Sequence, residues 1–112
     1  MQTASTTRLT LAFKAPLFKL GRLVATPGAL DALAPWPGRL EALVHRHVAG
    51  DWGVVSDDDR HQNDWAALHD DRILSAYPID ESKPSRGYGE NTVWIITEWD
   101  RSVTTVLLPE DY

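Results

Sequence analysis

Residues 92–112 read TVWIITEWDRSVTTVLLPEDY, and no other part of the chain constrains the fold as strongly. Two runs rich in β-branched and aromatic residues, Val93 to Thr97 and Val103 to Leu108, flank the short polar connection Glu98 to Ser102. This pattern predicts a β-hairpin. Both faces of the first run are largely apolar, which predicts that it is a central strand of its sheet.

Two helices are predicted in the first half of the chain. Thr26 followed by Pro27 is typical of a helix start, and this short helix should end near Pro35. The second helix is expected from about Gly38 to Ala49. Its apolar residues fall at offsets of three and four, which makes one stripe of Leu40, Leu43, Val44, His47 and Val48.

A third helix is predicted from Ser56 to about His69. Ser56 is placed to cap its first turn, with an acid three positions later. Trp65 and Leu68 are expected to form its apolar side. The polar connection from Pro78 to Asn91 contains Gly and Pro and is long enough to be mobile.

Further strands are predicted over Arg72 to Tyr77 and, in two pieces, over Leu9 to Phe13 and Phe18 to Val24. The order is therefore one strand, two or three helices and three consecutive strands. We expect an α+β fold with an antiparallel sheet of about four strands and two or three helices grouped on one face. At 112 residues the chain should be one domain, residues 8–112, after a disordered tail of residues 1–7.

Charge is unevenly distributed along the chain. Residues 1–30 carry four basic residues and no acid, whereas residues 31–112 carry 7 basic and 16 acidic residues, for a net charge of −5. The basic start superficially resembles an organelle transit peptide, but it also contains the first predicted strand. The acidic remainder argues against direct binding to nucleic acid, which needs Lys and Arg at the phosphates.

The composition excludes several kinds of site. The chain has no cysteine, so it has no disulfide, no thiolate nucleophile and no Cys-based metal site. No apolar run approaches the roughly 20 residues that cross a bilayer. We expect a cytoplasmic protein with no membrane segment and no cofactor.

Seven aspartates and one Arg lie between residues 51 and 71. Three interpretations are open: a solvated helix start, an acidic surface that faces a partner, and a metal site. The spacing lacks the ligand pattern of a calcium loop, and acids in a first helical turn are stabilised by the helix dipole. The aspartates are Asp51, Asp57, Asp58, Asp59, Asp64, Asp70 and Asp71.

None of the four histidines has the spacing of a metal site, so we expect satisfied imidazoles without a catalytic role. The five tryptophans are more distinctive. Trp65 and Trp94 are expected in the core. Trp36, Trp52 and Trp99 lie in turn-like segments and are placed like interface anchors.

The connection between the last two strands contains Glu98, Asp100, Arg101 and Ser102. Two carboxylates with separated pKa values could act as acid and base. In a tight turn, however, both should be wet, with Asp and Ser bonded to the backbone. We expect turn chemistry and an ion pair of Arg101 with Asp100 or Glu98.

Three blocks of the sequence resemble a family of short bacterial proteins carried on plasmids and integrated elements. They are LVATPGAL (residues 23–30), HVAGDWG (residues 47–53) and ITEWDRSVTTVLLPEDY (residues 96–112), and the resemblance covers about residues 18–112. Some members carry labels that point to plasmid functions or restriction-modification systems. The chain has no Gly-rich S-adenosylmethionine motif and is too short for a methyltransferase domain, so such a label implies genomic context only.

These observations support three functional hypotheses. The first is a non-enzymatic, cytoplasmic accessory protein of a mobile genetic element that acts by protein–protein contact, with a homodimer as a further option. The second is a small hydrolase or nuclease that uses Asp51, Glu98, Asp100 and Arg101, and the third is an acidic inhibitor that imitates DNA. No catalytic residue or metal ligand is assigned, and the predicted binding residues are Trp52, Trp99, Asp51, Asp57, Asp58, Asp100 and Arg101.

Overall fold

A computed structural model of the chain describes residues 15–112. The predicted tail, residues 1–7, and the predicted strand piece from Leu9 to Phe13 lie outside the described residues. In chain order the described elements are β1 (Arg22–Ala25), α2 (Pro27–Leu33), α3 (Arg39–Val48), α4 (Asp57–Leu68), β2 (Ile73–Pro78), β3 (Thr92–Thr97), β4 (Val103–Leu107) and the 3-10 helix η1 (Pro109–Asp111).

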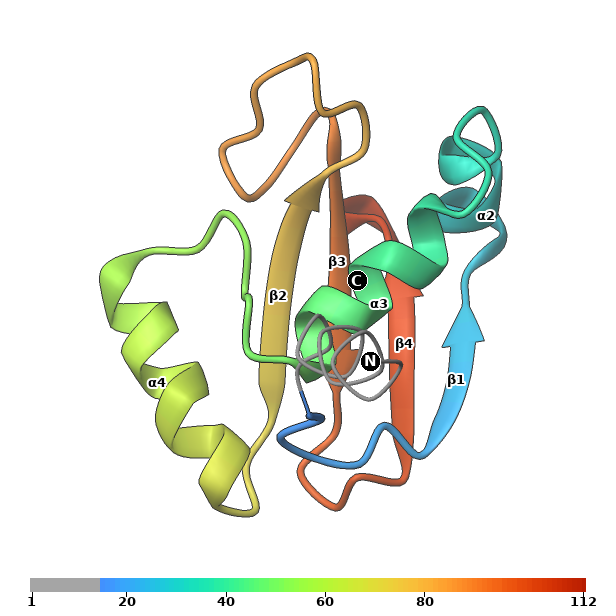
Figure 1. Cartoon of the computed structure of the whole chain (residues 1–112). Coiled ribbons are helices and arrows are strands. Elements are labelled where there is room, and N and C mark those ends of the chain that lie inside the picture. The colour runs from blue at the N-terminus through green and yellow to red at the C-terminus, as the bar shows by residue number, and fades with distance from the viewer. Residues whose placement is uncertain (1–14) are drawn as a thin grey trace, which may run out of the picture.

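The predicted α+β class is confirmed. The strands form one sheet in the order β1-β4-β3-β2, and Figure 1 shows β1 and β2 at its two edges. β3 pairs antiparallel with both β2 and β4, so the prediction of a central strand is also confirmed. β1 runs parallel to β4, which makes the sheet mostly rather than wholly antiparallel. The two strands are far apart in the sequence, so no tight turn dictates their relative direction.

Helices α2 and α3 pack on one face of the sheet, and α4 lies beside the edge strand β2 (Figure 1). The larger core cluster, between this face and helices α2 and α3, contains Ala29, Leu33, Leu43, Val44, Tyr77, Val93, Ile95 and Val106. A smaller cluster joins α4 to the start of β2 through Ala66, Ala67 and Ile73, together with Trp52. The apolar stripe predicted for α3 therefore faces the sheet, with Leu43, Val44 and His47 buried.

The opposite face of the sheet carries Trp94, Ile96 and Leu107, which alternate with the core residues of the same strands. The C-terminal segment lies against this face, because η1 contacts β3 and the rings of Trp94 and Tyr112 are 5.8 Å apart. Ile96 and Leu107 are buried on this face. This covering explains why both faces of β3 are apolar in the sequence.

The predicted helix starts are confirmed. The Thr26 hydroxyl accepts a hydrogen bond from the Ala29 N–H at 3.2 Å, and the Ser56 hydroxyl accepts one from the Asp59 N–H at 3.1 Å. The first strand, in contrast, starts later than predicted, at Arg22. The residue before it, Gly21, has a φ of +65°, and a Cβ there would collide with the Arg101 carbonyl oxygen. The chain turns at Gly21 to reach β4, which shortens the strand.

Candidate functional site

Helix α4 turns its largest apolar side chains to solvent. The residues that it buries are Asn63, Ala66 and Ala67. Trp65, predicted in the core, is 50% exposed, and Leu68 is 78% exposed. The side chains that α4 buries are no larger than that of Asn63, and the two large residues lie on the outer side. The prediction that Trp65 lies in the core is wrong.

Arg101 joins the carboxyl end of α4 to the turn between β3 and β4. Its guanidinium donates hydrogen bonds to the carbonyl oxygens of Ala66 at 2.7 Å, His69 at 2.8 Å and Asp71 at 2.5 Å. It also donates to Glu98 O in its own turn, at 3.1 Å. A cation at a helix C-terminus satisfies carbonyls that have no partner within the helix and is favoured by the helix dipole.

The ion pair predicted for Arg101 is therefore wrong. Its guanidinium binds backbone carbonyls, and Glu98 lies 3.9 Å from Arg72 instead. Asp100 accepts hydrogen bonds from the N–H of Ser102 at 3.1 Å and from its hydroxyl at 2.6 Å. The hydroxyl contact is the larger of the causes that lower the pKa of Asp100. The predicted turn chemistry at Asp100 and Ser102 is confirmed.

Because Arg101 binds both elements, the carboxyl end of α4 and the turn between β3 and β4 lie at the same end of the molecule (Figure 1). Trp99 is 61% exposed in the turn. On α4, the ring of Trp65 stacks on His69 with centroids 4.1 Å apart. We call Trp65, Leu68, His69 and Trp99 the α4–turn surface. Exposed Asp70 and Asp100 lie beside it in the sequence, so the apolar residues have acidic neighbours.

Trp52 is not an exposed anchor, because the structure places it in the core at 3% exposure. Its indole N–H donates to Asp64 at 2.8 Å, and its ring stacks on Phe18 with centroids 6.2 Å apart. The segment around Trp52 runs beside β2, where Gly53 forms a parallel bridge with Ala76. Burial of Trp52 follows from this tertiary pairing, which its turn-like sequence did not reveal.

Three of the predicted acidic residues, Asp51, Asp57 and Asp58, lie at the start of α4 or before it. Asp51 forms an ion pair with Arg46 at 2.7 Å. Asp57 pairs with Arg60 at 3.0 Å, and Asp58 is exposed in the same first turn. Asp57 and Asp58 are thus part of a solvated helix start, as one of the three interpretations has it.

A series of hydrogen-bonded polar side chains crosses the core, and the sequence analysis did not predict it. His47 is fully buried, with Nδ1 2.6 Å from the Ser75 hydroxyl and Nε2 2.8 Å from the Thr97 hydroxyl. Thr97 lies 2.7 Å from the Thr104 hydroxyl, which donates to Leu20 O at 2.6 Å. The signal in the sequence was His47 on the apolar stripe of its helix, together with Ser and Thr at inward positions of strands.

The last hydrogen bond of this series, from Thr104 to Leu20 O, assigns the tautomer of His47. Leu20 O can only accept, so Thr104 donates to it and must accept from Thr97. Thr97 then accepts from Nε2–H of His47, and Nδ1 accepts from Ser75. Burial, with a smaller contribution from the charge of Arg101, lowers the pKa of His47 to about 3, so the ring is neutral.

A serine that donates to a histidine is the arrangement of a nucleophile and its base. Here, however, both Ser75 and His47 are 0% exposed, and the far ring nitrogen of His47 binds Thr97 rather than a carboxylate. No substrate could reach the Ser75 hydroxyl in this packing. The prediction of satisfied imidazoles holds for His47, because both of its ring nitrogens lie within hydrogen-bond distance of a hydroxyl.

The carboxylates of the hydrolase hypothesis, Asp51, Glu98 and Asp100, each have a different partner in the structure. Asp51 and Asp100 are tied to different neighbours, and across residues 15–112 no three His, Asp or Glu side chains are grouped as metal ligands. Hollows of about 510 Å³ beside Trp36 and about 220 Å³ beside Asn63 are lined by other residues.

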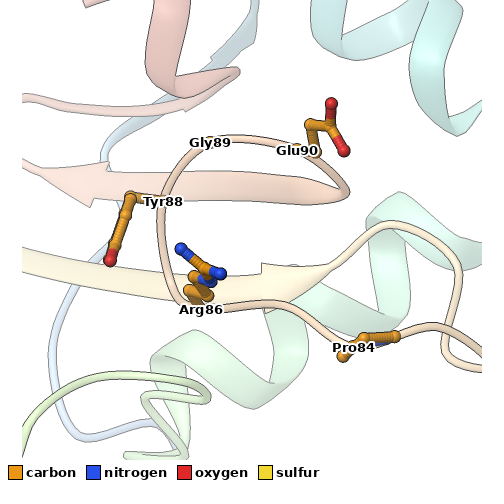
Figure 2. A pocket seen from close by; sticks show the side chains of 5 residues that line it. All are labelled: Pro84, Arg86, Tyr88, Gly89 and Glu90. Atoms are coloured by element: carbon orange, nitrogen blue, oxygen red, sulfur yellow. The ribbon is translucent and has the colours of Figure 1, made fainter.

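A further hollow of about 390 Å³ lies in the loop between β2 and β3. Its lining side chains come from Pro84, Arg86, Tyr88 and Glu90, and Figure 2 shows Tyr88 and Glu90 pointing to different sides of the loop. The groups do not converge on one point. The loop itself is tied by the Asn91 amide, which donates to the carbonyl oxygens of Asp80, Lys83 and Pro84 at 3.1 to 3.2 Å.

Within the described part of the chain, no helix is long and apolar enough to cross a membrane. Comparisons of the sequence with protein-family models and with curated proteins, and of the structure with solved structures, found no match.

Proposed function

We propose that this chain is a cytoplasmic, non-enzymatic accessory protein of a mobile genetic element, and that it binds a protein partner through the α4–turn surface. The observation that carries the proposal is the orientation of α4, which buries two alanines and exposes Trp65 and Leu68. A helix in a single domain usually buries such side chains. Large aromatic residues exposed together are typical of contact surfaces.

The partner surface should be apolar at its centre and basic at its rim. Asp70 and Asp100 flank the exposed rings, and the negative charge of Asp100 is stabilised by the Ser102 hydroxyl. Attraction between opposite charges at the rim of an interface speeds association, and salt weakens this attraction. Binding should therefore be slower in high salt, while the apolar centre keeps the complex together.

Site-directed photo-crosslinking tests this proposal in cells of the native host. A photoreactive benzoylphenylalanine in place of Leu68 should yield one dominant protein adduct, identified by mass spectrometry. The matched control has the same group in place of Leu30, which is also exposed, at 51%, but lies on α2. The control position should give no such adduct.

Variants then separate binding from folding. Trp65→Ala and Trp99→Ala should abolish the Leu68 adduct and change the free energy of unfolding by less than about 0.5 kcal/mol, because both side chains are largely exposed. Trp36→Ala, at an exposed tryptophan elsewhere, should leave the adduct unchanged. Equal adducts at both crosslinking positions, or an adduct that survives both alanine variants, would refute the proposal.

A further inference from the structure

The two edge strands of the sheet, β1 and β2, differ in whether their outward backbone groups have hydrogen-bond partners. At the β2 edge, Val54 N–H donates to Ala76 O at 2.7 Å, and Ala76 N–H donates to Trp52 O at 3.1 Å. The Asn63 amide completes the cover, because it donates to Leu74 O at 2.8 Å and accepts from Leu74 N–H at 3.3 Å. The outward backbone groups of β2 are thus satisfied within the protein, which prevents pairing with another chain.

The β1 edge has no such cover in residues 15–112. The N–H groups of Arg22 and Thr26 donate inward to β4, to the carbonyl oxygens of Ser102 at 3.0 Å and Val106 at 2.9 Å. Backbone groups alternate along a strand, so those of Leu23 and Ala25 point outward. No strand of the described chain pairs with them. Leu23 is also 45% exposed, so an apolar side chain lies at the surface beside the unpaired backbone groups.

Two charged residues, Arg22 and Asp111, lie near opposite ends of this edge. Arg22 is exposed and forms no ion pair with any residue that the structure describes. At the other end of the strand, the Thr26 hydroxyl donates to the Asp111 carboxylate at 2.6 Å and is the main cause that lowers the pKa of Asp111. Arg22, Val24 and Thr26 alternate along β1 and share one face. One edge thus carries a cation at its start and an anion at its end.

We propose that two copies of this chain form a dimer by antiparallel pairing of their β1 edges around a two-fold axis at Val24. In this register Leu23 of one copy exchanges both backbone hydrogen bonds with Ala25 of the other. Arg22 then lies opposite Thr26 of the second copy, within reach of its Asp111. The symmetry repeats this ion pair, so the charges of the edge are self-complementary.

Sedimentation velocity over a range of protein concentrations tests the dimer. The wild-type protein should shift from monomer to dimer as concentration rises. Leu23→Pro should remain monomeric at every concentration, because proline removes an outward N–H that bonds to no residue from 15 to 112 and leaves the inward bonds of β1 to β4 intact. Circular dichroism should confirm that this variant is folded.

Charge exchange tests the register. Arg22→Glu and Asp111→Arg should each be monomeric alone, whereas a mixture of the two should form a heterodimer in which both ion pairs are restored with reversed or native sign. Arg86→Glu, at an exposed arginine outside the edge, is the control and should dimerise like the wild type. A wild-type monomer at all concentrations, or a dimer that survives Leu23→Pro, would overturn the proposal. Neither result bears on binding through the α4–turn surface.

Discussion

Acidification should destabilise the protein through His47. The imidazole is neutral in the folded state because burial lowers its pKa from 6.5 to about 3. In the unfolded chain it takes up a proton below its ordinary pKa, so the unfolded state binds more protons between these two values. The stability that His47 contributes is therefore complete above about pH 7 and is lost as the pH falls.

The magnitude follows from the size of the pKa shift. Each pH unit below the ordinary value removes about 1.4 kcal/mol from the free energy of unfolding. At about pH 4.5 the loss should be about 3 kcal/mol, and at about pH 3 it approaches 5 kcal/mol. Three carboxyl groups, Asp80, Asp100 and Asp111, have pKa values lowered from their ordinary value of 3.8. They therefore change the free energy of unfolding only at a lower pH than His47 does. The window above about pH 5 thus reports on histidine.

Urea unfolding followed by tryptophan fluorescence at several pH values measures this slope. His47→Gln has no titrating group and should be less stable at neutral pH, with a flatter pH dependence above about pH 5. His61→Gln, at an exposed histidine of α4, should keep the wild-type slope.

Nuclear magnetic resonance of the wild-type imidazole gives a second readout that does not depend on the variant folding. The ring should stay neutral, with its proton on Nε2, while the protein remains folded. A His47 ring that titrates near its ordinary pKa in the folded protein, or a slope unchanged in His47→Gln, would refute the reasoning.

Two further predictions concern the backbone. Arg101→Ala should lower the free energy of unfolding by about 3 kcal/mol or more, because it leaves several carbonyls without their charged donor, and urea unfolding measures the loss. Gly53→Ala should destabilise far more than Gly38→Ala in the same assay. Both glycines have positive φ values, +76° and +83°, but a Cβ at Gly53 would collide with the Ala76 carbonyl oxygen, whereas at Gly38 it meets nothing within 4 Å. The Gly38 variant should lose only about 1–2 kcal/mol of stability, which is the cost of a side chain in this left-handed backbone conformation. Equal losses of stability in the two variants would contradict this explanation.

Local patterns predicted most of the fold. The caps at Thr26 and Ser56 and the stripe on α3 depend on neighbours within a few residues, so the sequence alone contains the relevant interactions. The apolar faces of β3 likewise indicated a central strand. The parallel direction of β1 could not be predicted in this way, because it depends on a partner strand far away in the sequence.

The candidate site was predicted only in part. Trp99 was expected at the surface and is exposed there, but the neighbouring Arg101 was expected in an ion pair and instead binds the end of α4. Trp52 and Trp65 exchanged their predicted places. Whether a ring is buried depends on which segment packs against it, and that information is absent from the spacing of either residue.

The amino-acid order is enough to predict the α+β class, the helix starts and the alternation of the strands, because each of these follows from interactions between near neighbours. Packing of distant segments settled the rest: α4 buries Asn63 and two alanines and leaves Trp65 exposed, Arg101 ties the helix to the β3–β4 turn, and His47 bonds to hydroxyls from two strands. These contacts join residues many positions apart, and which residues a close approach buries or exposes is defined only when the whole core has formed.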